Sequence, residues 1–173
     1  MKRICAIAAL TLSALLVMAS AASAGTTINS ANAPNGTHFK SGTATCSVSG
    51  TTVSCTGYTL AGVGNINATA NLSATYSATV VCRNNGGNLS DSQHQGSFTK
   101  DTSSGTLQSK NGNLTVPPLS TSAPTEQQFL AQQTCPNPGW TPELQGPITL
   151  TTFTYTLTFQ GFTGAYITIT PDP

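Results

Sequence analysis

The stretch INATANLSATYSATVVC, residues 66–82, decides the fold. Every second residue from Ile66 to Cys82 is apolar or small, and the residues between them are Asn, Ser or Thr, with Val81 as the exception. A period of two residues is typical of a β-strand and not of a helix. At about 3.3 Å per residue the stretch is longer than most strands, so we expect a bend or a change of partner within it.

The C-terminal part of the chain repeats the alternation with larger side chains. In TFTYTLTFQGFTGAYITIT, residues 152–170, one face of the expected strand carries Phe153, Tyr155, Leu157 and Phe159. The other face carries threonines, and a turn near residues 161–164 leads back through Ile167 and Ile169. Small side chains packed against large ones fill a core to normal density, so we expect the bulky residues to form the layer opposite the alanine-rich stretch.

Shorter segments complete the expected sheets. Further strands are predicted near residues 26–29, 98–102, 106–110 and 113–116. The last two are joined by an expected turn at Asn111 and Gly112. Leu150 has the opposite parity to Phe153 along the C-terminal strand, which predicts a bulge near Thr151.

One segment, SAPTEQQFLAQQTC at residues 122–135, has the pattern of a short helix. Ser122 is suited to cap it and Pro124 to stand in its first turn. The sequence therefore predicts an all-β protein, a two-sheet antiparallel β-sandwich with two disulfides and one short helix near 124–133.

The N-terminus has the features of a secretory signal peptide, residues 1–24. Lys2 and Arg3 precede an apolar run over residues 4–17, and Ala22 to Ala24 form an A-x-A-like cleavage site. After Gly25 no stretch approaches the roughly 20 apolar residues that a membrane span requires. We expect residues 25–173 to form a single secreted domain, extracellular, at the cell surface or periplasmic, with no membrane contact after cleavage.

Charged side chains are few. Removal of Lys2 and Arg3 leaves four basic side chains against five acidic ones, a net charge of −1. A nucleic-acid surface needs clustered Lys and Arg, and a membrane-bound amphipathic helix needs a basic face. The composition therefore argues against both kinds of partner.

Four cysteines follow the signal peptide, and their spacing suggests how they pair. In TCSVSGTTVSC, residues 45–55, a tight turn at Gly50 and Thr51 places Cys46 directly opposite Cys55, at a site where side chains approach most closely. Cys82 then pairs with Cys135 by elimination. A zinc site is the competing interpretation, but no C-x-x-C pair occurs and export favours oxidation. We expect two disulfides, no metal and no other cofactor.

Four short segments carry a resemblance. GVGN (62–65), CRNNGGN (82–88), KNGNLTV (110–116) and CPNPGW (135–140) together resemble a group of exported bacterial β-sandwich proteins that have no established activity. The resemblance implies a bacterial secreted β domain. It assigns no functional residue.

The polar segment that follows residue 82 contains the strongest candidates for a site. Asp91 and His94 have a spacing that suits a base with an orienting carboxylate, or two ligands of a metal. Either site needs further groups, and His38 is the only other imidazole. We therefore predict no catalytic residues. The candidate ligand-binding residues are Asn84, Asn85, Asn88, Asp91, His94 and Trp140.

Few titratable groups and a neutral polar exterior favour a secreted non-enzymatic extracellular module. Its expected role is structural, surface-assembling or ligand-binding, with a glycan, cell-surface components or a second copy as partner. Trp140 and the rings at 153, 155 and 159 could stack on sugars, although most of these rings are expected in the core. The alternatives are a small secreted hydrolase that uses His94 and Asp91, or a protease-inhibitor-like loop at 83–97 braced by Cys82 and Cys135.

Overall fold

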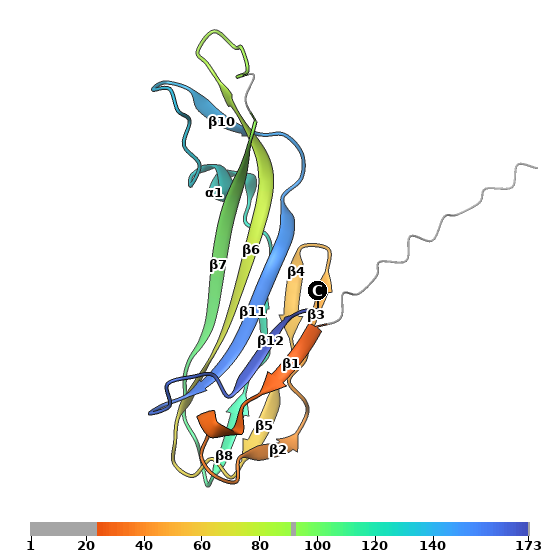
Figure 1. Cartoon of the computed structure of the whole chain (residues 1–173), viewed down its shortest axis with the longest axis vertical. Coiled ribbons are helices and arrows are strands. Elements are labelled where there is room, and N and C mark those ends of the chain that lie inside the picture. The colour runs from red at the N-terminus through yellow and green to blue at the C-terminus, as the bar shows by residue number, and fades with distance from the viewer. Residues whose placement is uncertain (1–23, 91–92, 173) are drawn as a thin grey trace, which may run out of the picture.

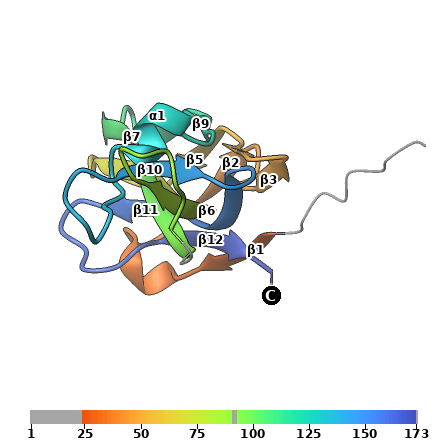
Figure 2. The same ribbon diagram turned by 90° about the horizontal axis from the view of Figure 1, so that it is seen from above.

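The computed structural model of the chain describes residues 24–90 and 93–172. Residues 1–23 of the expected signal peptide, and Asp91, lie outside the described residues. The predicted fold class is confirmed: the protein is built from antiparallel strands, with two disulfides and one short helix. The strands form a long sheet with smaller sheets against one of its faces (Figures 1 and 2).

The long sheet contains six strands. They are β1 (Ala24–Ile28), β6 (Ala68–Arg83), β7 (His94–Leu107), β10 (Thr141–Leu144), β11 (Thr149–Phe159) and β12 (Ile167–Pro171). Their order is β1-β12-β11-β6-β10, and β7 pairs with the other edge of β6. The longest strand, β6, therefore lies at the centre of the molecule.

The second layer is divided into two three-stranded sheets. One consists of β2 (His38–Ser41), β5 (Tyr58–Ala61) and β8 (Asn113–Val116), and the other of β3 (Cys46–Ser49), β4 (Thr52–Cys55) and β9 (Leu119–Thr121). A 3-10 turn, η1 (Ser30–Asn32), and the helix α1 (Glu126–Leu130) complete the described chain. In Figure 1 the two small sheets lie beside the lower half of the long sheet, and α1 lies near its upper end.

The alternation that predicts β6 is confirmed. Leu72, Tyr76 and Val80 are fully buried, whereas the residues between the buried positions are half-buried or exposed. The alternation begins at Ala68 and not at Ile66, which lies before the strand and is 36% exposed. The expected change of partner also occurs, because one edge of β6 pairs with β11 up to Ser77 and with β10 from Val80 to Arg83.

The expected position of the C-terminal rings is wrong. Phe153 pairs with Ala74 and Phe159 with Ala68, so the bulky residues lie beside the alanines in the same sheet and not opposite them. Large and small side chains alternate across one sheet face, because cross-strand neighbours point to the same side. The layer opposite comes from the small sheets, which contribute the buried side chains Val53, Leu60, Leu114 and Val116.

Two other irregularities concern the long strands. The predicted bulge in β11 is confirmed, since the register with β6 shifts between Leu150 and Thr152. The two strands predicted at 98–102 and 106–110 are instead one strand, β7. Its register with β6 shifts between Thr69 and Asn71, where β7 has one extra residue, and Gly105 there has a φ of +67°.

The N-cap of the helix lies three residues after the predicted one. Thr125, and not Ser122, is the N-cap: its hydroxyl accepts a hydrogen bond from the backbone N–H of Gln128, whose side chain accepts one from the Thr125 N–H. This reciprocal pair satisfies two backbone donors at the helix start. The buried side chain of Phe129 fixes the helix on the sheet beside Ala78 and Val80.

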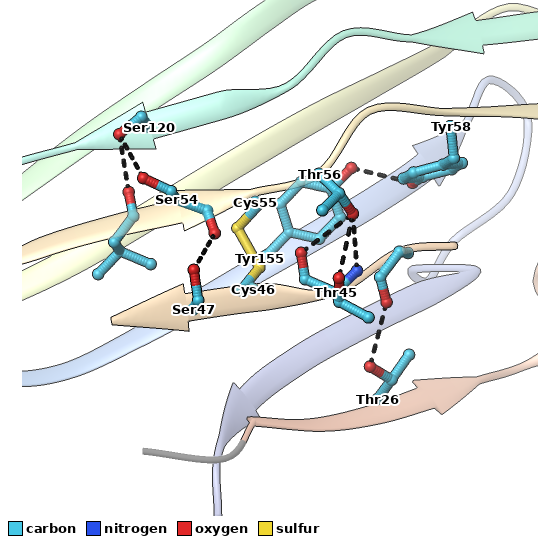
Figure 3. The surroundings of a disulfide bond; sticks show 12 residues. Thr26, Thr45, Cys46, Ser47, Ser54, Cys55, Thr56, Tyr58, Ser120 and Tyr155 are labelled. Atoms are coloured by element: carbon cyan, nitrogen blue, oxygen red, sulfur yellow. Dashed lines mark hydrogen bonds between the residues drawn. A yellow bond between two sulfur atoms is a disulfide. The ribbon is translucent and has the colours of Figure 1, made fainter. Parts of the chain in front are cut away.

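Both predicted disulfides are present. Cys46 lies directly opposite Cys55 in the β3–β4 hairpin, with 4.0 Å between their Cα atoms, and Gly50 in the turn has a φ of +58°. This disulfide belongs to the same buried cluster as Tyr155 of β11 (Figure 3). The second disulfide joins Cys82 at the end of β6 to Cys135, which follows α1.

A buried hydrogen bond joins the two layers. The hydroxyls of Tyr58 in β5 and Tyr155 in β11 are 2.9 Å apart (Figure 3). Burial raises the pKa of both phenols, and it also raises the pKa of Tyr76 and Tyr166, so all four tyrosines of the chain are affected.

This burial predicts how the protein responds to alkali. Because the folded-state pKa values lie above the ordinary 10.0, the unfolded chain releases phenolic protons first, and the stability declines as the pH rises above that value. Phenolate absorbance should stay low at the ordinary tyrosine pKa and appear together with the loss of the circular dichroism of the fold. Ionisation of two or more tyrosines in the native protein near that pKa would contradict the described packing.

The second disulfide should stabilise the fold strongly. It closes a loop of 53 residues, for which the chain-entropy model gives about 4 kcal/mol. The double variant Cys82→Ala, Cys135→Ala should lower the free energy of unfolding in urea by this amount. A loss below about 1 kcal/mol would show that the α1 segment holds its position without the covalent link.

Candidate functional site

The predicted site residues lie around the upper end of β6, where β7 and β10 flank it (Figure 1). Arg83 is the last residue of β6 and pairs with Thr141 of β10. Residues 84–93 then connect β6 to β7, which begins at His94. The predicted loop 83–97 is therefore shorter in the structure, because its two ends belong to strands.

The described part of this loop is held by its own hydrogen bonds. The Asn84 N–H donates to the carbonyl of Asn88 at 3.0 Å, and the Asn88 N–H donates to Oδ1 of Asn84 at 2.9 Å. The Gly87 N–H donates to the Asn84 carbonyl at 2.9 Å, and Gly87 has a φ of +84°. The backbone and side chain of Asn84 thus shape the turn, whereas Asn85 is exposed. The asparagine and glycine residues of this segment are therefore explained by the geometry of the turn.

An ion pair ties the loop to β10. Arg83 donates from Nε to Oε1 of Glu143 at 2.6 Å and from Nη2 to Oε2 at 2.9 Å. Its Nη1 donates to the carbonyl of Gly87 at 2.5 Å. The hydrogen bond from Arg83 holds the pKa of Glu143 below its ordinary value. No local sequence pattern indicates this pair, because its members are 60 residues apart.

His94 lies at the start of β7, opposite Val80, and its side chain is exposed. It borders a hollow of about 390 Å³ whose other lining residues are Cys82, Thr134, Cys135 and Pro136. The structure therefore places His94 beside the second disulfide. Its predicted partner Asp91 lies outside the described residues. In residues 24–90 and 93–172 no group of three or more His, Cys, Asp or Glu side chains could hold a metal ion.

Trp140 does not join His94 in one pocket. It directly precedes β10, which pairs with one edge of β6, whereas His94 belongs to β7 on the other edge. Trp140 is half-buried. Phe153, Tyr155 and Phe159 are core residues, and each of the eleven aromatic side chains of the chain is buried or half-buried. The structure thus offers no exposed flat platform of aromatic rings in the part that it describes.

A groove beside β11 was not anticipated from the sequence. β12 pairs with β11 only from Tyr155 to Leu157, so from Thr149 to Phe153 the described chain provides β6 on one side of β11 and no strand on the other. Unpaired backbone N–H and C=O groups along a strand edge can accept a further strand. The sequence could not reveal this edge, because it depends on where β12 ends.

A cavity of about 510 Å³ follows this free edge. Its lining is Val48, Gly50 and Thr51 of the β3–β4 hairpin, residues 147–153, and Pro171 at the end of β12. The lining is mainly apolar, and none of these residues is charged. We call this feature the β11 groove.

The outer face of the long sheet is rich in hydroxyl groups and carries little charge. Four rows cross β11, β6 and β7: Thr152 with Thr75 and Thr99, Thr154 with Ser73 and Asp101, Thr156 with Asn71 and Ser103, and Thr158 with Thr69 and Thr106. A hollow of about 390 Å³ lies at the lower end of this face, with Asn71 and Gln160 among its lining residues.

No family model, curated protein or solved structure matches this chain. The resemblance to exported bacterial β-sandwich proteins therefore stays a prediction. Across residues 24–90 and 93–172, none of the helices has the length and apolar character that a bilayer span requires.

The Arg83–Glu143 pair predicts a local effect of acid. Because the folded-state pKa of Glu143 lies below the ordinary 4.5, the stabilisation is present above that value and is lost as the pH falls through the folded-state pKa. The protection factors of the amides at Asn84, Gly87 and Asn88, which compare each exchange rate with that of an unstructured chain at the same pH, should be constant down to the ordinary glutamate pKa and fall below it. Glu143→Gln should show fast exchange already at neutral pH. Equal exchange in both proteins at neutral pH would mean that the pair does not hold the loop.

Proposed function

We propose that the protein is a secreted, non-enzymatic extracellular module that assembles with a second copy of itself through the β11 groove. The two disulfides indicate an oxidising, extracellular-type environment. The observation that carries the proposal is the free strand edge from Thr149 to Phe153 with an apolar cavity alongside it.

The groove suits a polypeptide strand better than a sugar. One wall supplies backbone donors and acceptors in strand geometry, and the other walls supply apolar surface from Val48, Ile148 and Leu150. An added strand would satisfy the backbone groups and place alternate side chains in the cavity. A glycan presents hydroxyl groups, which apolar walls cannot satisfy.

The same edge is complementary to itself. Antiparallel pairing about a two-fold axis brings Thr149–Phe153 of one molecule against the same five residues of another, and each molecule then presents the surface that it contacts. None of the residues known to line the groove is charged, so two copies approach without like-charge repulsion. A homodimer is therefore the simplest assembly that closes both edges.

Substitution of Leu150 by lysine tests the proposal. A charged side chain in the apolar groove must be desolvated on assembly, so Leu150→Lys should raise the dissociation constant by about tenfold or more. Thr156→Lys on the outer face is the matched control and should leave association unchanged. Val48→Lys on the opposite wall gives a second variant if Leu150→Lys unfolds. Analytical ultracentrifugation of the protein from residue 25 measures the effect, and a wild-type protein that stays monomeric at high concentration would overturn the proposal.

A neutral polysaccharide is the second candidate ligand, and the outer face favours it. Its rows of hydroxyl groups carry one charged residue, Asp101. The hollow beside Asn71 is lined by five hydrogen-bonding side chains together with Ala68 and Phe159. The wild-type protein should sediment with insoluble cellulose or chitin, and Asn71→Ala should reduce the bound fraction severalfold because a hydrogen-bonding side chain is lost from the hollow. Asn35→Ala, an exposed asparagine elsewhere, is the matched control. An equal loss of binding in Asn35→Ala would argue against the outer face as the binding surface.

The hydrolase that uses His94 and Asp91 and the inhibitor-like loop at 83–97 stay predictions. His94 has no acidic residue in its hollow as far as the chain is described. Arg83 and Asn84 have structural hydrogen bonds within the loop, which leaves fewer of its groups free to meet a protease.

A further inference from the structure

Asp172 lies against Gly25. A Cβ atom at position 25 would lie 2.7 Å from Oδ1 of Asp172, closer than such atoms come in folded proteins. The carboxylate therefore occupies the space that a side chain at position 25 would need. Asp172 directly follows β12, whose residues Thr170 and Pro171 pair with Gly25 and Ala24 of β1.

Gly25 is also the expected first residue of the mature protein. Hydrolysis of the Ala24–Gly25 peptide bond by a signal peptidase adds one water molecule and leaves a carboxylate on Ala24 and an α-ammonium on Gly25. Before cleavage the Gly25 nitrogen is a neutral amide. After cleavage it is a cation attached to the Cα atom that the Asp172 carboxylate already faces.

We propose that Asp172 is the binding site for the new N-terminus, so that processing creates an ion pair that fastens β1 to the end of β12. This inference rests on the proposed secretion and cleavage, and not on assembly through the β11 groove. Arg83–Glu143 is the only ion pair found in residues 24–90 and 93–172, so Asp172 has no competing salt bridge there. Because Gly25 has no side chain, the Asp172 carboxylate can lie close to its Cα atom.

The start of β1 is where such an ion pair matters. β1 is an edge strand, and its residues are half-buried or exposed. At its far end the Asn29 N–H donates to the carbonyl of Tyr166 at 2.8 Å. Near its start, the described contact to the other layer is a 3.3 Å hydrogen bond from the Thr26 hydroxyl to the Ala44 carbonyl (Figure 3). An ion pair at Gly25 would reduce fraying of this end.

The ion pair also borders the β11 groove. Pro171, the partner of Ala24, lines the groove. After cleavage, the proposed ion pair between the Gly25 ammonium and Asp172 would therefore lie at the edge of the groove.

A cycle of four proteins tests the inference. Two proteins begin at Gly25, and two begin at Ala19, which places the ammonium six residues earlier. For each N-terminus, one protein has Asp172 and the other has the substitution Asp172→Asn. In the Gly25 pair the substitution should lower Tm by about 1–3 °C at low salt, as for a single exposed ion pair. In the Ala19 pair it should have no effect. The difference should shrink at high salt, because screening weakens exposed pairs.

Two controls separate the possible outcomes. Asp101→Asn removes an exposed acid of the outer face and should leave Tm unchanged from either start, which excludes an effect of net charge. N-terminal sequencing of the protein secreted from the full chain should begin at Gly25. Equal effects of Asp172→Asn from both starts, or a secreted protein that begins elsewhere, would overturn the inference. Failure of dimerisation would affect only the proposed assembly.

Discussion

The apolar face of β6 has to be covered along the whole strand, and this requirement organises the structure. Two different covers meet it: the small sheets cover the part from Ala68 to Tyr76, and α1 covers Ala78 and Val80. The second cluster is small, with Phe129 as its one large buried side chain, and burial of this size stabilises a segment only weakly. The disulfide between Cys82 and Cys135 lies close in sequence to this small cluster.

The sequence contains enough information for strand faces and local pairings, but not for neighbours across space. A period of two residues assigns Phe153 to the dry side, yet the same pattern results whether the ring lies opposite Ala74 or beside it. The Cys46–Cys55 pairing was predictable because a two-residue turn fixes the register over a few residues. The sequence predicts two strands in place of β7, because Ser103, Ser104 and Gly105 resemble a turn. In the structure, pairing with the long strand β6 keeps these residues in one strand. The same holds for the candidate site. Asn84 and Asn88 are close in sequence and could be predicted as candidates, whereas the contact with Glu143 and the β11 groove depend on segments that are distant in sequence.

A neutral exterior gives the molecule few ways to act on a partner. Its described charges are dispersed, and the Arg83–Glu143 pair is used to hold a loop. Recognition through strand edges and hydroxyl rows depends on shape and backbone pairing, so it needs little charge. The expected mature N-terminus, the end of β12 and the β11 groove meet around Pro171. The proposed cleavage, the proposed ion pair at Gly25 and the proposed assembly would therefore involve one small region of the surface.

Amide hydrogen exchange along β6 tests most directly whether this strand is the element on which the fold depends. The amides from Ala70 to Ser77, paired with β11 on one side and β7 on the other, should exchange only through global unfolding. Those from Val80 to Arg83, under the smaller cover, should exchange faster once the second disulfide is reduced. Uniform fast exchange over Ala70–Ser77, with slower exchange in β1 or β10, would contradict a core built on β6.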